Sequence, residues 1–157
     1  MIEQIYTYFT VEMIFMWLNL GVLPFWLVLI VFPQSQICRV FIISIFPIFI
    51  LSLAYGYLLY LFFNEGYDFI KNFELYLGLD AVSNLFTDKA FIILFWLHFL
   101  AMNLFCGGWI VKDSQKFGIN RILLSFPILI TYFIGPIGLT LYWFMKIFYA
   151  KRINLYD

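Results

Sequence analysis

The chain has 157 residues, of which 65% are hydrophobic and only 11% are charged, and its formal net charge at pH 7 is zero. An ordinary soluble domain carries about 25% charged residues, so this composition excludes one and indicates an integral membrane protein. The balanced charge provides no basic surface that could follow phosphates, so nucleic acid is not an expected partner.

The first predicted span covers residues 11–32. It begins after Thr10, a residue type that caps helix N-termini, and it ends before Pro33. Glu12 and Asn19 are seven residues apart, so they lie on one helical face. We interpret Glu12 as an interfacial residue at the helix start and Asn19 as a candidate ligand contact inside the membrane.

A polar link over residues 34–39 leads into the second predicted span, residues 40–63, which contains Pro47. Residues 64–89 form the long segment that does not cross the membrane, and they are rich in Asp and Glu. Apolar side chains recur in this segment at helical spacing: Phe69, Ile70, Phe73 and Leu77. Part of the segment is therefore predicted to be a helix lying in the plane of the membrane interface.

The third predicted span, residues 90–111, holds the chain's only histidine. One stripe of this helix and its end contains His98, Met102, Phe105, Trp109 and Asp113. A neighbouring stripe contains Asn103 and Gly107. Polar groups cost several kcal/mol in hydrocarbon unless they face the protein interior or a cavity. The helix is therefore predicted to face inward, with the other helices packed around it.

Small residues predict two helix-packing surfaces. Gly107 and Gly108 lack side-chain bulk, which allows another helix or a ligand to come close. In the fourth predicted span, residues 121–144, a stripe of small residues and a proline shares one face: Pro127, Thr131, Gly135 and Gly138. Pro136 is predicted to bend this span.

These spans predict an all-α, polytopic membrane protein. It is a bundle of four transmembrane helices in a single integral membrane domain, residues 1–157, with membrane lipid around it and both termini on one side. Opposite the termini lie Arg39, Lys112, Lys116 and Arg121. On the terminal side lie Lys71, Lys89, Lys146, Lys151 and Arg152. Four basic residues against five set no orientation under the positive-inside rule.

Several chemistries are excluded by the motifs that the sequence lacks. A single histidine cannot supply both axial ligands of a bis-histidine haem. The sequence has no zinc-ligand spacing, no glycine-rich phosphate loop and no nucleophile motif, so neither a metal nor a cofactor is expected. Residues 1–6 lack the basic region of a signal peptide. We therefore expect a bacterial protein, or a targeting segment outside this chain.

The third span carries a family pattern, matched by Trp96, His98, Leu100, Leu104, Phe105 and Asp113. Residues 22–25, 57–60 and 135–138 resemble the corresponding parts of the same pattern. Over nearly its whole length the chain resembles the abscisic-acid-deficient-4-like membrane proteins, whose plant members are required for making neoxanthin. It departs from the family at Asn103, where an Asp is usual, and at Gly108, where many bacterial members have Arg.

The resemblance implies a redox-neutral rearrangement of a xanthophyll, in which a 5,6-epoxide opens to a tertiary alcohol while a proton leaves the polyene and an allene forms. This step needs an acid and a base but no electron carrier. His98 is the catalytic candidate, and Asn103 can only form hydrogen bonds. By helical rise, His98 and Asp113 lie about 22 Å apart, so they cannot act together on one carbon.

The sequence therefore supports a carotenoid-related membrane protein, either a xanthophyll-modifying isomerase or a carotenoid-binding protein. The alternative is a non-enzymatic accessory or pigment-binding subunit of a larger membrane complex, which would have membrane-protein partners or a second copy of itself. A small transporter ranks last. Candidate substrate contacts are Asn19, Trp96, Asn103, Gly107 and Trp109. The expected location is a bacterial inner membrane or a thylakoid or plastid membrane.

Overall fold

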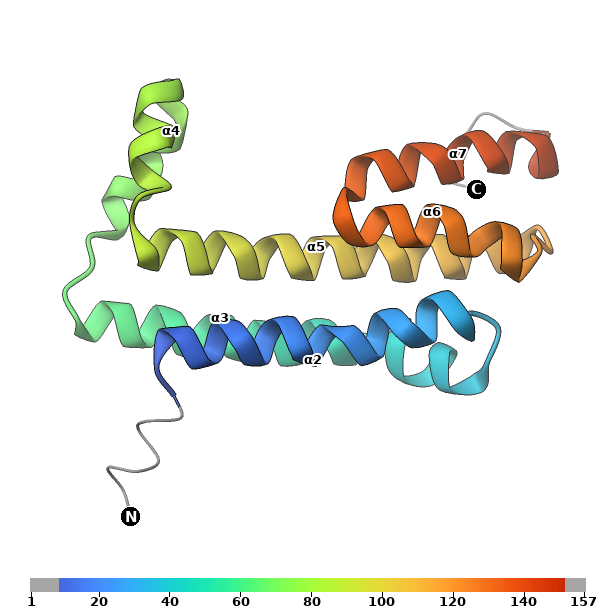
Figure 1. The fold of residues 1–157 in the computed structure, drawn as a ribbon, viewed down its shortest axis with the longest axis horizontal. Coiled ribbons are helices and arrows are strands. Elements are labelled where there is room, and N and C mark those ends of the chain that lie inside the picture. The colour runs from blue at the N-terminus through green and yellow to red at the C-terminus, as the bar shows by residue number, and fades with distance from the viewer. Residues whose placement is uncertain (1–8, 152–157) are drawn as a thin grey trace, which may run out of the picture. The chain divides into compact units, whose positions relative to one another are not determined.

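The computed structural model describes residues 9–151, and over this range the chain is helical without a strand. The elements in chain order are α2 (Val11–Val31), the π-helical turn η1 (Cys38–Ile42), α3 (Phe46–Asn64), the 3₁₀-helix η2 (Phe69–Tyr76), α4 (Leu79–Leu85), α5 (Lys89–Lys116), α6 (Arg121–Phe133) and α7 (Gly135–Ala150) (Figure 1). The predicted all-α fold class is confirmed. The predictions for residues 1–6 and for Arg152 lie outside the described range.

The described residues form two compact units. The first contains the described part of residues 1–19 together with Ile50–Phe99. The second contains Leu20–Phe49 and the described part of residues 100–157. Each of the long helices α2, α3 and α5 contributes residues to both units. A single integral membrane domain over residues 1–157 stays a prediction.

Three stretches within the described residues are long and apolar enough to cross a membrane: Val11–Val31, Cys38–Asn64 and Lys89–Lys116. At a rise of about 1.5 Å per residue, each reaches the roughly 30 Å thickness of the hydrocarbon core. They overlap the spans that the sequence predicted over residues 11–32, 40–63 and 90–111.

Residues 121–144, predicted as one span, belong instead to two helices. α6 and α7 are separated by Ile134, whose backbone is extended (φ −140°, ψ 84°). Pro136 follows, and a helix does not continue smoothly through proline, because the ring lacks an N–H and clashes with the carbonyl four residues earlier. The two helices lie side by side as a hairpin (Figure 1). With 13 residues, α6 extends only about 20 Å and is too short to cross a bilayer.

The predicted small-residue surface is confirmed as a packing surface, and it joins the two helices of the hairpin. Pro127, Thr131, Gly135 and Gly138 are all buried. A Cβ atom added to Gly138 would collide with the Thr131 backbone and hydroxyl. The Thr131 hydroxyl donates a hydrogen bond of 2.7 Å to the Pro127 carbonyl, so this polar group is satisfied within α6. The two helices of the hairpin therefore pack together where Gly138 contacts Thr131, whose hydroxyl is already hydrogen-bonded within α6.

Candidate functional site

The two adjacent glycines of α5 have different surroundings in the second unit. A Cβ atom added to Gly107 would lie 2.9 Å from two ring carbons of Trp26, so α2 packs its indole directly onto this glycine. The predicted close approach of another helix is confirmed at this position. At Gly108 the nearest atom to an added Cβ is the Ile42 carbonyl oxygen, at 3.9 Å. Gly107 therefore has no room for a side chain, whereas Gly108, which is also buried, has room for one and borders an unfilled space beside α5.

That space is a groove with a volume of about 200 Å³. One wall comes from η1, the following turn and the start of α3: Ile42, Ile43, Ser44, Pro47 and Ile48. The other wall comes from α5: Leu104, Phe105, Gly108, Trp109 and Lys112. All of these residues belong to the second unit, so the groove lies within one compact body.

The η1–α3 wall follows from its local sequence. A π-type hydrogen bond of 2.9 Å joins the Ile43 N–H to the Cys38 carbonyl and ends the first helical turn. The Ser44 hydroxyl then accepts a hydrogen bond of 3.2 Å from the Phe46 N–H, a capping contact at the start of α3. Pro47 therefore lies inside the second span, as predicted, but in the first turn of α3, where its missing N–H costs nothing.

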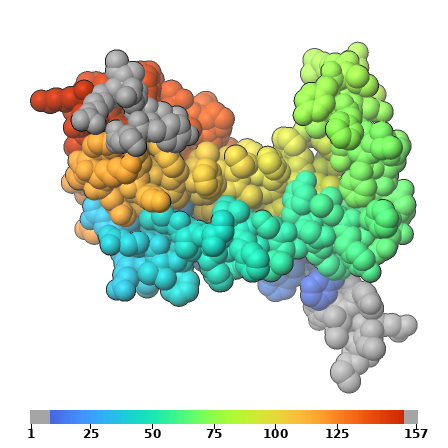
Figure 2. All heavy atoms as spheres, turned by 180° about the vertical axis from the view of Figure 1, so that it is seen from behind, coloured from blue at the N-terminus to red at the C-terminus, as the bar shows by residue number. Residues whose placement is uncertain are grey.

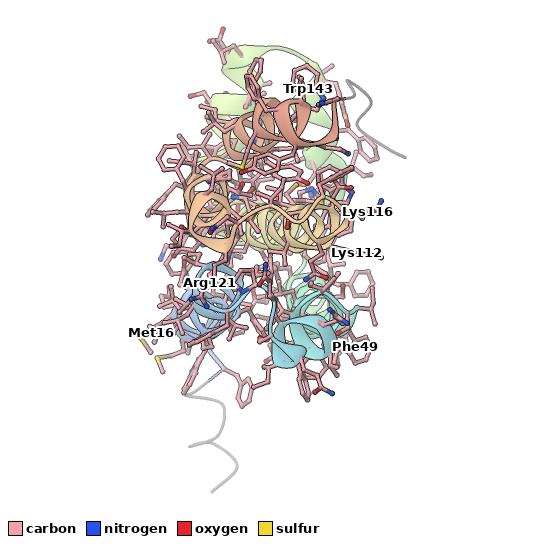
Figure 3. All side chains as sticks on the ribbon, turned by 90° about the vertical axis from the view of Figure 1, so that its right-hand side faces the viewer. Met16, Phe49, Lys112, Lys116, Arg121 and Trp143 are labelled. Carbon is pink, nitrogen blue, oxygen red and sulfur yellow. The ribbon has the colours of Figure 1, made fainter. Side chains whose placement is uncertain are left out.

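The groove is mostly apolar, with one charge at its mouth. Among the described residues that line it, Lys112 alone is ionisable. Lys112 is exposed, and Lys116 projects from the same side of α5 (Figure 3). A ligand in the groove would therefore meet apolar walls, the Trp109 indole, the Ser44 hydroxyl and an ammonium group.

A buried ionic cluster lies at the C-terminal end of α5, next to Trp109. The Asp113 Oδ2 atom lies 2.9 Å from the Lys146 ammonium and accepts a 2.7 Å hydrogen bond from the Tyr142 hydroxyl. The exposed Lys116 lies 3.4 Å from the other carboxylate oxygen. Only 3% of Asp113 and none of the surface of Lys146 and Tyr142 is exposed. Both buried charges are thus paired and hydrogen-bonded, the condition under which proteins tolerate them.

Trp109 connects this cluster to the groove. Its ring packs edge-to-face against Tyr142, with the ring centroids 5.7 Å apart. The Lys146 ammonium lies 5.9 Å from the Trp109 ring centroid and 5.0 Å from that of Phe117, both within cation–π range. The cluster thereby holds the indole that lines the groove.

Asn103 is buried in the second unit, at the tip of the α6–α7 hairpin. Its amide nitrogen lies 3.4 Å from the Tyr132 carbonyl, to which it donates. Pro136, four residues after Tyr132, has no N–H to give that carbonyl, so Asn103 supplies the missing donor. The absence of a side chain at Gly135 provides the space for the Asn103 side chain, because an added Cβ would collide with the Asn103 side-chain oxygen. This contact explains how an asparagine is accommodated deep inside an apolar helix.

The remaining predicted site residues lie in the first unit. The side-chain oxygen of Asn19 accepts a 3.0 Å hydrogen bond from the Trp96 indole N–H, and the side-chain nitrogen of Asn19 donates to the Phe15 backbone carbonyl at 2.7 Å. His98 is exposed, and no hydrogen bond or ion pair joins it to another described residue. This corrects the prediction that the whole stripe faces inward: His98, Met102 and Phe105 are exposed, whereas Trp109 is half-buried and Asp113 is buried. The side chains of α5 are apolar on every face of the helix, so the sequence pattern does not reveal which face is buried.

Tyr142 and Lys146 are the site residues that the sequence analysis missed. They are four residues apart, so they share one face of α7, and a lysine in an otherwise apolar stretch was the available signal. Lys146 was assigned to the membrane side opposite Asp113, because residues 121–144 were taken as one span. The hairpin reverses the chain and brings Lys146 to Asp113 instead.

The described residues contain no group of three or more His, Cys, Asp or Glu side chains that could hold a metal ion. Cys38 and Cys106 are both free thiols.

Comparison with known proteins agrees with the resemblance seen in the sequence. The family model described as ABA DEFICIENT 4-like matches residues 13–142. A related protein, Protein ABA DEFICIENT 4, chloroplastic, from Arabidopsis thaliana, is 25% identical over 129 residues. The similarity covers 80% of this chain but 57% of the relative, so the chain spans little more than half of that protein's length. No solved structure matches the chain. Because the family match extends over most of the sequence, the protein belongs to the ABA DEFICIENT 4-like family.

Proposed function

We propose that this protein acts in xanthophyll metabolism by binding the end ring of a carotenoid in the groove beside Gly108 and Trp109. Two observations support this function: the chain belongs to the ABA DEFICIENT 4-like family, for which the sequence resemblance implies xanthophyll chemistry, and the groove is mostly apolar. The observation that carries it is the space at Gly108, which an α5 side chain would otherwise fill.

The groove suits one end of a xanthophyll better than the whole molecule. Pockets that enclose a complete small ligand usually have volumes of about 300–1,000 Å³, and this groove has about 200 Å³. A methylated ring fits against Trp109 and the isoleucines, while the polyene continues along the apolar surface of the helices. The Lys112 ammonium is the group that would donate to a hydroxyl or epoxide oxygen on that ring, whereas the Ser44 hydroxyl, which donates to the Phe41 carbonyl, would accept from a ring hydroxyl.

The groove favours binding over acid–base chemistry. Rearranging an epoxide to an allene needs one group that gives a proton and another that accepts one. Lys112 is the one ionisable group among the described lining residues, and its ammonium can only donate hydrogen bonds. A base for the departing proton is not among these side chains. We therefore assign the groove to binding, with any partner subunit or second copy supplying further groups.

Filling the groove tests this function. Expressed in a xanthophyll-producing bacterial host and purified in mild detergent, the wild-type protein should carry pigment, measured by its absorbance per protein. Gly108→Leu should lose most of the pigment, because the leucine occupies the groove. Gly56→Leu is the matched control, since nothing lies within 4 Å of a Cβ atom at that position. Pigment retained equally by both variants would refute binding in the groove.

A second candidate, a redox-neutral xanthophyll isomerase, rests on His98. This side chain is exposed on a helix that is apolar enough to cross a membrane, so a lipid-dissolved substrate could reach it. Pigment extracts from hosts that express wild-type protein or His98→Ala would be compared by chromatography. An allenic product that appears only with the wild-type protein supports catalysis, and identical pigment profiles refute it. On either reading the protein would reside where xanthophylls dissolve, in a thylakoid or plastid membrane or a bacterial inner membrane.

A further inference from the structure

The segment between α3 and α5 exposes large apolar side chains in a regular pattern. η2 is a 3₁₀-helix, which has about three residues per turn, so side chains three positions apart point in the same direction. Ile70, Phe73 and Tyr76 therefore form one stripe, here called the η2 stripe. The exposed fractions of these residues are 76%, 70% and 85%. The sequence predicted α-helical spacing in this segment, and the tighter 3₁₀ turn makes Tyr76 the third member of the stripe in place of Leu77.

Contacts on another face fix the orientation of this stripe. Phe69 and Asn72 are partly buried, and the Tyr67 hydroxyl donates a 2.7 Å hydrogen bond to the Asn72 side-chain oxygen. Burial, and then the charges of Asp88 and Asp68, raise the pKa of Tyr67, so the hydroxyl keeps the proton that it donates. Because the face with Phe69 and Asn72 packs against the rest of the first unit, the η2 stripe points away from the rest of that unit.

The segment joins two stretches that are long and apolar enough to cross a membrane. The candidate spans before and after it end at Asn64 and begin at Lys89. Within the first unit, α4 runs across the axis of α5, and the segment protrudes sideways from it (Figures 1 and 2). A segment that lies across a membrane-crossing helix at its end lies in the plane of the membrane surface.

The remaining side chains have the polarity that such a position requires. Lys71 and Glu74 lie on the third face of η2, where Lys71 is exposed and Glu74 is half-buried. Beyond η2, Leu77 and Leu79 continue the apolar surface and are also largely exposed. An apolar stripe beside a charged face, with a tyrosine among the apolar residues, is the arrangement of segments that rest in the lipid interface.

We propose that the η2 stripe, together with Leu77 and Leu79, is a membrane-interface anchor that inserts between lipid headgroups next to the α3 and α5 ends. Such segments bury their apolar face to a depth of about 5–10 Å. The anchor would fix how far α3 and α5 extend into the bilayer. This inference does not depend on the pigment-binding function.

Spin labels placed on neighbouring faces of η2 test the anchor. In a background with Cys38→Ala and Cys106→Ala, single cysteines are introduced as Phe73→Cys on the stripe and Lys71→Cys on the charged face. The labelled full-length proteins are reconstituted into phosphatidylcholine vesicles, and collision rates with oxygen and with a water-soluble nickel chelate are measured. Wild-type-like helicity by circular dichroism shows that each variant has folded.

The anchor predicts opposite results at the two positions. The label at 73 should collide mainly with oxygen, which concentrates in lipid, and the label at 71 mainly with the nickel chelate, so that the two accessibility ratios differ several-fold. Equal nickel accessibility at both positions would overturn the proposal in favour of a solvated loop. A label at 73 that is shielded from both reagents would overturn it in favour of a protein partner or a second copy, which dipolar broadening would identify.

Discussion

Asp113 carries a negative charge at a buried end of α5, and Lys146 and Tyr142 are its buried partners. Removing one member of a buried ion pair leaves the other charge without compensation, which typically costs about 3–5 kcal/mol. The exposed Lys116 also reaches Asp113, so it compensates a part of this loss. The pair is therefore expected to matter far more for stability than any of the exposed lysines.

Lys146→Met should lower the free energy of unfolding by about 3 kcal/mol, whereas Lys112→Met, at an exposed position, should change it by less than about 0.5 kcal/mol. Denaturant titration in detergent micelles, followed by tryptophan fluorescence, measures both. Adding Asp113→Asn to Lys146→Met should recover much of the loss, because the unpaired carboxylate is then gone. Equal stability of the two single variants would contradict a structural role for the pair.

At the scale of elements, α2 and α5 pack through a glycine that admits one large aromatic side chain. Replacing a helical glycine by alanine normally stabilises a helix by about 1 kcal/mol. Overpacking a tight contact costs about 1–3 kcal/mol, so the sign of each substitution depends on the surroundings. Gly107 meets the Trp26 ring, whereas Gly108 has only a carbonyl oxygen near 4 Å.

We therefore expect Gly107→Ala to destabilise the protein and Gly108→Ala to leave it unchanged or slightly more stable, a difference of about 1–3 kcal/mol. The two variants have the same chemistry on adjacent residues of one helix, so each controls for the other. Thermal unfolding in the same detergent compares them, with Trp26 fluorescence as a local probe. A gain in stability for both variants would contradict close packing of α2 against α5 at Gly107.

At the scale of the whole molecule, the hairpin changes which basic residues lie at each end of α5, compared with the four-against-five distribution that four spans predicted. Among the described residues, the exposed basic side chains at the C-terminal end of α5 and in the rest of the second unit are Arg39, Lys112, Lys116, Arg121 and Lys151. At the N-terminal end of α5 and in the segment before it, the exposed basic residues described are Lys71 and Lys89. Under the positive-inside rule, the C-terminal end of α5 should face the cytoplasm in a bacterial host.

Cysteine labelling in intact cells measures this orientation. In the background without Cys38 and Cys106, Asp80→Cys should react with a membrane-impermeant maleimide from outside. Gln36→Cys should react only after the cells are lysed, because the link before α3 lies at the basic end. Both positions are exposed, so accessibility within the protein does not separate them. The reverse labelling pattern would show that the basic residues do not set the orientation.

Composition and apolar run length alone determined that the chain is a helical membrane protein and located three of its long helices. Burying so many apolar groups requires either a core or lipid, and runs of this length satisfy their backbone hydrogen bonds only as helices. The small-residue positions Gly107, Thr131 and Gly138 were also predictable, because close packing needs residues without bulk. The family followed from the pattern around Trp96, His98 and Asp113.

Only the tertiary structure decided which side of α5 is buried and where the chain turns back. An apolar helix has no contrasting face, so the sequence could not show that His98 is exposed while Asn103 is buried. The break at Ile134 depends on Asn103 satisfying the Tyr132 carbonyl that Pro136 leaves without a donor. That contact joins residues 29 apart in the chain. The same reversal brings Lys146 to Asp113, because a buried charge needs a partner that local sequence does not supply.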